Sequence, residues 1–169
     1  MFENIKSNQH LRPYLAESCC ENDICIEFEE NIPSEDKLII KVDDYYNALP
    51  LGLDTPPSPD CLILVRCNEG GYSLHIVELK NITTSKGYDI NNLTAKFDTC
   101  IYDFIEKRFP NLLHMEYKTV KLYFVSRIDH HTRDMGLKYE LLMGHRINFN
   151  GKRLLIRAFI PTPKIKHCY

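Results

Sequence analysis

The chain lacks any hydrophobic run that approaches the roughly 20 residues of a membrane-spanning helix. Its first residues, Met-Phe-Glu-Asn-Ile-Lys, lack the basic and then apolar segments of a secretory signal peptide. No internal repeat or low-complexity tract is present. These absences predict a cytoplasmic protein that does not contact a membrane. With 169 residues, 44% apolar and 26% charged, we expect one globular domain over residues 1–169.

The seven cysteines lack the regular spacing of a zinc site or a disulfide scaffold. Three of them fall within seven residues of one another, but their separations do not match a zinc-binding motif. Without a secretion signal, they are predicted to be reduced thiols, several of them in the core. They are Cys19, Cys20, Cys25, Cys61, Cys67, Cys100 and Cys168.

The chain also lacks a net positive charge, since its formal charge is −2. The charges are nevertheless segregated along the sequence. Residues 1–117 hold 10 Lys+Arg and 20 Asp+Glu, whereas residues 118–169 hold 11 Lys+Arg and 3 Asp+Glu. A C-terminal third of net charge +8 on a remainder of −10 is the asymmetry expected where one face meets phosphates. The alternative is a solvated basic face that the acidic part balances within the fold.

The most informative stretch runs from Pro59 to Asn81 and predicts two strands joined by a tight turn. Residues 62–65 form a short apolar run, Asn-Glu-Gly-Gly at 68–71 is typical of a hairpin turn, and residues 72–79 are rich in β-formers. Antiparallel pairing brings Asp60, at the start of the first strand, next to Glu78 and Lys80 at the end of the second. Side chains alternate along a strand, so Glu78 and Lys80 share a face while Leu79 points into the core.

Two neighbouring carboxylates repel each other unless a cation lies between them. A hard divalent ion such as Mg²⁺ is suited to this position, because it is held by one or two carboxylates and keeps water and phosphate in the rest of its shell. The Leu79 carbonyl lies between Glu78 and Lys80 and could supply a further oxygen ligand. Lys80 would stand beside a metal-activated water, an arrangement suited to phosphodiester hydrolysis.

Pro59-Asp60, followed after seventeen residues by Glu78-Leu79-Lys80, resembles the signature of the PD-(D/E)XK nuclease superfamily, which includes many type II restriction endonucleases and Holliday-junction resolvases. Asn81 also fits, because a small polar residue often follows the lysine there. The resemblance implies an α/β (α+β) fold with a central mixed sheet flanked by helices, built as a helix, a three-strand meander, a helix and a further strand. It implies that Asp60 and Glu78 bind Mg²⁺ and that Lys80 assists the water. It covers residues 59–81 closely and about 60–126 in outline, whereas an ordinary hairpin ending in a solvated Glu-Lys pair is the alternative.

This superfamily often adds a further acid from its first helix or first strand. Glu17, Glu30 and Asp44 are candidates, and spacing does not choose among them. Lys96 and Asp98 lie near the start of a helix predicted from Asn91 or Asn92 to about Phe109, and we expect them on its solvated flank, with support of the metal site as the alternative.

Hydrophobic periodicity and turn residues predict the remaining elements. The patterns indicate two short helices over 2–21 broken at Pro13, strands over 24–28, 37–42 and 119–126, a helix capped by Asn91 or Asn92 and running to about Phe109, and a short helix over 134–143. Asn150-Gly151 is a type I′ turn signal between strands at 146–149 and 152–160.

Basic residues on that C-terminal hairpin are the candidate nucleic-acid contacts. Arg153 and Arg157 fall on one face of its second strand, and arginine is well suited to phosphate and guanine recognition. The predicted contacts are Lys86, in the loop after residue 81, and Arg146, Lys152, Arg153 and Arg157, in the expected substrate-contacting segment 127–169. Asp129-His130-His131 also appears in another family of metal-dependent phosphoesterases, but the earlier histidine and paired aspartates of that family are missing here.

The sequence therefore predicts a Mg²⁺-dependent endonuclease, with Mn²⁺ as a substitute metal, that hydrolyses DNA phosphodiester bonds. A restriction-type enzyme acting as a homodimer on double-stranded DNA is the favoured form, because two sites are needed to cut both strands. The alternatives are a structure-specific or repair nuclease of the same superfamily and a non-catalytic nucleic-acid-binding subunit. An RNA substrate also stays open.

Overall fold

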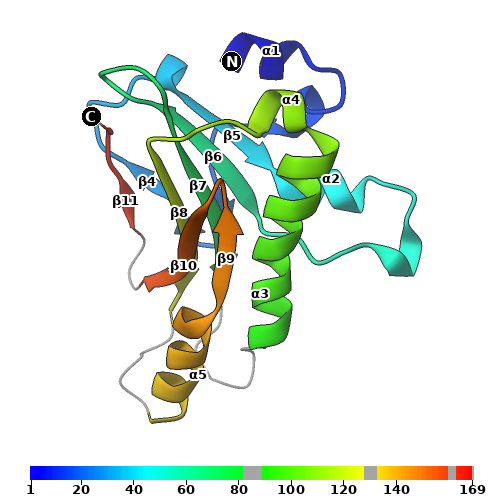
Figure 1. Ribbon diagram of the computed structural model, residues 1–169, viewed down its shortest axis with the longest axis vertical. Coiled ribbons are helices and arrows are strands. Elements are labelled where there is room, and N and C mark those ends of the chain that lie inside the picture. The colour runs from blue at the N-terminus through cyan, green and yellow to red at the C-terminus, as the bar shows by residue number, and fades with distance from the viewer. Residues whose placement is uncertain (82–88, 128–132, 160–162, 169) are drawn as a thin grey trace.

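The computed structural model describes residues 1–81, 89–127, 133–159 and 163–168. Its centre is a mixed sheet of seven strands in the order β1-β5-β6-β7-β8-β10-β9 (Figure 1). The strands are β1 (Leu15–Ala16), β5 (Lys37–Lys41), β6 (Cys61–Arg66), β7 (Tyr72–Lys80), β8 (Thr119–Ser126), β9 (Arg146–Phe149) and β10 (Lys152–Phe159). The predicted α/β (α+β) class with a central mixed sheet is confirmed.

The hairpin predicted from Pro59 to Asn81 forms the middle of this sheet. β6 and β7 pair antiparallel, with Cys61 opposite Val77 and Arg66 opposite Tyr72. The connecting turn needs left-handed backbone at Gly70 (φ 83°) and Gly71 (φ 82°), a conformation that glycine adopts without steric cost. β5 continues the antiparallel meander on the other side of β6.

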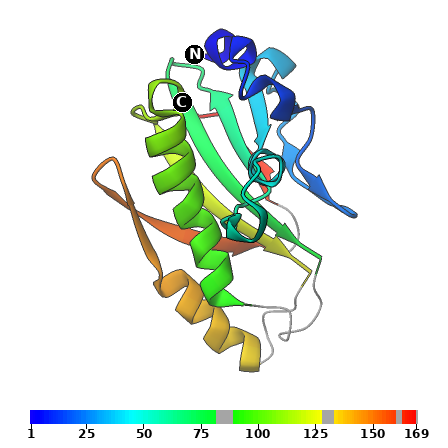
Figure 2. The same cartoon turned by 90° about the vertical axis from the view of Figure 1, so that its right-hand side faces the viewer.

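After β7 the chain forms a long helix and returns as β8, which pairs parallel to β7. The helix consists of α3 (Ile90–Asp98) and a π-helical continuation, η5 (Thr99–Arg108), and lies across one face of the sheet (Figure 2). Its N-cap is Asp89, whose carboxylate accepts a hydrogen bond from the Asn92 backbone N–H, so the predicted cap at Asn91 or Asn92 is wrong. Asp89 has the extended backbone of a cap, whereas the two asparagines are already within the first helical turn.

The sheet has two faces that bury different cores. The helix face carries Leu74, Ile76 and Phe124, which belong to one cluster with Leu93 and Phe97 of α3. The back face carries alternate residues of the same strands in a second cluster, which are Val77, Leu79, Tyr123 and Val125 packed with Ile165. Ile165 belongs to β11 (Lys164–Ile165), which pairs with β4 (Glu27–Phe28) on the side away from α3 (Figure 1).

The remaining elements are short. Of the two helices predicted before residue 21, α1 (Phe2–Ser7) is present and the second is only a 3₁₀ turn, η1 (Arg12–Tyr14), which contains Pro13. The single strand predicted over 24–28 is instead two, because β3 (Ile24–Cys25) pairs with β2 (Cys20–Glu21) and β4 pairs with β11. The other short elements are η2 (Ser34–Asp36), α2 (Val42–Asn47), η3 (Gly52–Asp54) and α4 (Pro110–Leu113).

The C-terminal hairpin and its preceding helix are confirmed. α5 (Arg133–Gly144) precedes β9, and β9 pairs antiparallel with β10. Asn150 (φ 49°) and Gly151 (φ 71°) both have the left-handed backbone that a type I′ turn requires. β10 then joins the central sheet by pairing parallel to β8.

The prediction of reduced cysteines is wrong for six of the seven. Disulfides join Cys19 to Cys61, Cys20 to Cys25 and Cys67 to Cys168, while Cys100 is a buried free thiol. Spacing along the chain could not reveal these pairs, because strand pairing and the return of the C-terminal segment bring the partners together. Disulfides persist in oxidising compartments, so the cysteine content no longer supports a cytoplasmic location.

Within the described ranges, no helix combines the length and the apolar content that crossing a membrane would require.

We expect the three disulfides to differ in their effect on stability. In the loop-entropy model the Cys67–Cys168 bond, which spans 101 positions, stabilises the fold by about 5 kcal/mol, against about 2 kcal/mol for Cys20–Cys25, which spans 5. Urea unfolding of the oxidised protein should therefore show a larger loss for the double variant Cys67→Ser/Cys168→Ser than for Cys20→Ser/Cys25→Ser. Equal stability of the first variant and the wild type would contradict this.

Candidate metal-binding carboxylate site

Asp60 stands at the point where the chain enters β6, and two backbone contacts hold it. Its Oδ2 accepts a hydrogen bond from the Leu79 N–H at 2.6 Å. Its carbonyl accepts another from the Val42 N–H at 3.1 Å, at the start of α2. The sheet register, with Cys61 opposite Val77, places Asp60 opposite Glu78. The hairpin thus brings the first two predicted metal ligands together.

Glu78 is a nearly fully buried carboxylate, with 1% of its surface exposed, on the helix face of β7. Its Oε1 accepts a hydrogen bond from the Lys96 ammonium at 2.6 Å. Its Oε2 is buried with no hydrogen-bond partner in the described part of the chain. Burial first, and then the charge of Asp60, raise the pKa of Glu78 to about 8, although Lys96 and Lys80 oppose this rise.

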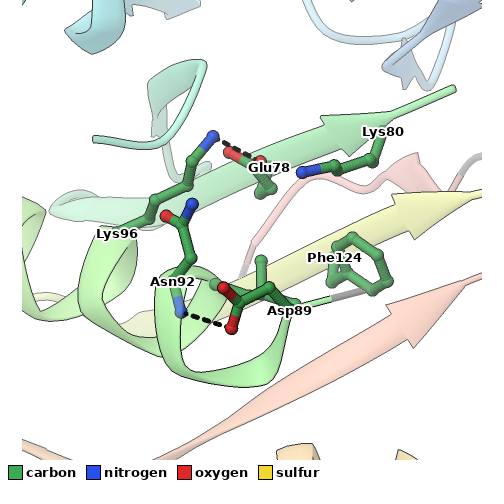
Figure 3. Close-up of a pocket in the computed structure, with 7 residues that line it drawn as sticks. Glu78, Lys80, Asp89, Asn92, Lys96 and Phe124 are labelled. Atoms are coloured by element: carbon green, nitrogen blue, oxygen red, sulfur yellow. Dashed lines mark hydrogen bonds and ion pairs between the residues drawn. The ribbon is translucent and has the colours of Figure 1, made fainter. Parts of the chain in front are cut away.

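Lys80 follows Glu78 on the same side of β7 and lines a small pocket beside it. In Figure 3 the Lys80 ammonium is directed toward Glu78, and Lys96 reaches the same carboxylate from α3. The cavity measures about 10 Å³, space for roughly one water-sized occupant. Its lining consists of Glu78, Lys80, Asp89, Asn92, Leu93, Lys96 and Phe124.

The backbone of Leu79 is directed toward Asp60. In an antiparallel pair the N–H and C=O of one residue point to the same side, so the Leu79 carbonyl faces the same neighbour as its N–H. Extending the register from Cys61 and Val77 places Pro59 opposite Leu79. Proline has no N–H, so it cannot donate a ladder hydrogen bond to this carbonyl. The oxygen predicted as a metal ligand therefore lacks its regular strand partner at this position.

A third acid approaches Asp60, and it is not one of the three predicted candidates. Glu17, Glu30 and Asp44 are exposed. Asp43, the neighbour of Asp44 on α2, is partly buried and its Oδ1 has no partner in the described ranges. Burial first, and then Asp60, raise its pKa. Val42, the neighbour of Asp43 at the start of α2, helps to hold this acid near Asp60, because the Val42 N–H donates to the Asp60 carbonyl.

Lys96 contacts the candidate site, which its position in the sequence did not predict. Its expected place was a solvated flank of the helix, yet its side chain is only 21% exposed and forms an ion pair with Glu78. The signal was its position one residue before Phe97, at the border of the apolar stripe, where a long side chain can reach from the helix to the sheet. Asp98 instead lies 3.4 Å from the His145 imidazole.

The donor set fits a hard cation. Burial dominates the raised pKa of Asp60 as it does that of Glu78, which is the behaviour of carboxylates that lack sufficient positive charge. No group of three or more His, Cys, Asp or Glu side chains that could hold an ion occurs in the ranges the structure describes. Two carboxylates, the Leu79 carbonyl and water or phosphate oxygens are a set that Mg²⁺ accepts.

The predicted nucleic-acid contacts do not converge on this site. Lys86 lies outside the described residues, as does the Asp129-His130-His131 motif. The Arg146 guanidinium donates to the carbonyls of Met143 and His145 at the end of α5, so it caps that helix. Within the described ranges, the cationic groups that lower the pKa of Asp60 and Glu78 are Lys41 of β5, Lys80 of β7 and Lys96 of α3, and none is on the C-terminal hairpin.

The other three contacts are exposed but lie elsewhere on the sheet. Leu154 and Ile156 belong to the core of the helix face, so Arg153 and Arg157 project from the back face, opposite to Glu78. Lys152 has the parity of the helix face, but the register places Phe159 level with Leu79. Seven residues before Phe159, Lys152 is therefore near the other end of the sheet.

We expect stability without metal to fall as the pH rises through the range in which Glu78 ionises. The usual pKa of 4.5 applies to the unfolded chain and about 8 to the folded one, so the unfolded state loses its proton first and stability declines between these values. A difference of one between the folded and unfolded pKa corresponds to about 1.4 kcal/mol, so the whole loss is on the order of a few kcal/mol. Thermal unfolding of Glu78→Gln from pH 5 to 8 should show a flatter profile than that of the wild type.

Comparison of the wild type with Glu78→Gln separates the pH dependence due to Glu78 from that of the other titratable groups. Buried His75, whose pKa is lowered to about 3, destabilises the fold on the acid side in both proteins. Addition of Mg²⁺ at pH 8 should raise the unfolding temperature of the wild type and not that of Glu78→Gln. Identical pH profiles would contradict the assignment.

Comparison with models of known protein families, with curated proteins and with solved structures found no match. The candidate site is therefore defined by its own geometry: two neighbouring carboxylates at the end of a hairpin, one orphaned oxygen on the buried Glu78 and two lysines directed at that same carboxylate.

Proposed function

We propose that the chain is a Mg²⁺-dependent endonuclease that hydrolyses phosphodiester bonds of DNA. The observation that carries this proposal is the meeting of Asp60, Glu78 and Lys80 at one end of the β6–β7 hairpin, with Glu78 buried and one of its oxygens unpartnered in the described part of the chain. A buried carboxylate of raised pKa next to a second carboxylate is costly for folding alone, which favours a functional reason for keeping it.

Asp60, Glu78 and the Leu79 carbonyl would hold the ion, and Mn²⁺ would serve in place of Mg²⁺. When bound, such an ion withdraws charge from a phosphoryl oxygen and promotes ionisation of water at neutral pH. The hydrogen bond from the Leu79 N–H fixes the rotamer of Asp60, so one oxygen is used for orientation and the other is left for a ligand.

The two lysines would have different roles. Lys80, at the open end of β7, would position the attacking water by hydrogen bonding and stabilise the negative charge that develops on phosphate. Lys96 touches the inner oxygen of Glu78 and favours its ionised form, so it acts as a positioning residue for the ligand.

The strand connections support the same proposal. The antiparallel β5–β6–β7 meander, the α3–η5 helix and β8 parallel to β7 follow the order that the resemblance to the PD-(D/E)XK superfamily implies. α1 precedes the meander, as the first helix of that order would. The order of strands and helices does not by itself imply an activity, so the proposal depends mainly on the two carboxylates.

A restriction-type enzyme acting on double-stranded DNA is the form we favour, with a homodimer to supply the two sites that a double-strand cut needs. A restriction-type enzyme would act in the cytoplasm, whereas the three disulfides are typical of an oxidising compartment. The position of Arg153 and Arg157 on the back face, away from the carboxylates, favours a second candidate, a non-catalytic nucleic-acid-binding subunit. A structure-specific or repair nuclease would use the same carboxylates.

Cleavage of mixed plasmid and phage DNA with Mg²⁺ tests the proposal. We expect the wild type to cut, Asp60→Ala to lose activity, and Lys80→Ala to lose about 10²–10⁴-fold in rate, the range for a positioned proton-transfer group. Lys107→Ala is the matched control, because this exposed lysine lies at the far end of η5 and should leave the rate unchanged.

The pattern of products separates the candidate functions. Discrete bands that require Asp60 indicate a sequence-specific enzyme, and a smear that requires Asp60 indicates a structure-specific or non-specific nuclease. Salt-sensitive DNA binding without cleavage, with the same affinity in Asp60→Ala, would contradict the catalytic proposal and favour the binding subunit.

A further inference from the structure

A second polar cavity lies on the back face of the sheet, on the other side from Glu78. It is formed by β7, β8 and the segment that follows β11, and measures about 160 Å³. That is well above the roughly 10–15 Å³ that a single water requires. The lining consists of Ser73, His75, Thr119, Lys121, Lys166, His167 and Cys168.

His75 is the buried polar group of this cavity. It is 1% exposed, and its ring stacks on Tyr123 with the centroids 5.7 Å apart. Its Nε2 lies 3.0 Å from the Ser73 hydroxyl, whereas its Nδ1 is buried with no partner in the described ranges. A buried imidazole nitrogen without a hydrogen bond is costly, so a polar ligand or water near this ring would offset that cost.

The cavity is also rich in positive charge. Lys121 and Lys166 line it, and Arg157 projects from the same face of the neighbouring strand. Burial first, and then the neighbouring charges of Arg157 and Lys166, lower the pKa of Lys121. No acidic side chain lines the cavity, and no described carboxylate forms an ion pair with Lys121 or Lys166. An anion would relieve this repulsion.

The wall made by the C-terminal segment is fixed in place. The disulfide from Cys168 to Cys67 ties it to the β6–β7 turn, and the Asn68 N–H donates to the Cys168 carbonyl at 3.0 Å. The His167 N–H donates to Glu29 at 3.1 Å, and its Nε2 lies 3.1 Å from the Arg66 carbonyl. The basic groups of this segment are therefore held against β7 and β8 before any ligand binds, which reduces the entropic cost of binding.

We propose that this back-face cavity is a binding site for a phosphate-class anion, either free inorganic phosphate or the terminal phosphate of a nucleotide. Lys121 and Lys166 supply the charge, and the Thr119 hydroxyl supplies a neutral donor. If the Ser73 hydroxyl donates to Nε2 of His75, the ring proton is on Nδ1, and an anion in the cavity would polarise this N–H electrostatically. The site lies on the opposite face from Asp60 and Glu78 and does not depend on the proposed nuclease activity.

Calorimetric titration of the oxidised full-length protein with inorganic phosphate tests the site. We expect saturable binding that Lys121→Gln and Lys166→Gln each weaken by about tenfold or more, because each removes a charge-assisted hydrogen bond. Lys164→Gln is the matched control, since it removes the same charge two residues away from an exposed side chain outside the lining. This control and Asp60→Asn should change the affinity by no more than about twofold.

A second readout follows the imidazole directly. Long-range ¹H–¹⁵N spectra should show the proton of His75 on Nδ1 and a change in the resonance of that nitrogen as phosphate is added. Titration with adenosine monophosphate identifies the source, because tighter binding than phosphate indicates a nucleotide and weaker binding indicates the free ion. Absence of saturable phosphate binding, an equal loss in Lys164→Gln, or an unmoved His75 signal would overturn the proposal.

Discussion

The antiparallel pairing of β6 with β7 is the constraint on which the other features depend. It places Asp60 opposite Glu78, and the Leu79 N–H fixes the Asp60 carboxylate where regular pairing ends. The same strand alternation sends Glu78 to the helix face and His75 to the back face. A slip of the register by one residue would exchange these faces and separate the two carboxylates, so the hydrophobic alternation that fixes the register also fixes the chemistry.

Burial of Glu78 is tolerated because the helix after β7 brings a cation to it. α3 packs Leu93 and Phe97 against the sheet, and Lys96 between them reaches the carboxylate. The ion pair with Lys96 occupies one Glu78 oxygen and leaves the other without a partner among the described residues. The packing of the helix therefore also leaves an oxygen that can bind a further cation. A buried pair of this kind contributes little to stability by itself, and its orientation of the carboxylate is its clearer effect.

The sequence was most informative where one strand or one turn decides the structure. Periodicity predicted β5, β7 and β8 almost to the residue, and Asn150-Gly151 predicted its turn, because these signals depend on near neighbours. The pairing that places Asp60 opposite Glu78 is predictable for the same reason, since the hairpin is local.

The errors concern residues brought together by distant parts of the chain. Lys96 meets Glu78 only after the helix packs, and Asp43 rather than Asp44 turns toward Asp60 because of the orientation of α2. Arg153 and Arg157 share one strand face, as the sequence predicts, but the side of the sheet on which that face lies depends on the parallel pairing of β10 with β8. The six bonded cysteines show the same limit, since their partners lie up to 101 positions apart.

The bond between Cys67 and Cys168 has a topological consequence. It closes the C-terminal part of the oxidised chain into a covalent ring and leaves the first 66 residues as a tail. Asp60 belongs to the tail and Glu78 to the ring, and the disulfide that touches Cys61 joins it to Cys19 within the tail. Crosslinking therefore cannot by itself assemble the acidic pair. The disulfides constrain the ring and the tail separately. The two carboxylates are brought together by the non-covalent pairing of β6, in the tail, with β7, in the ring.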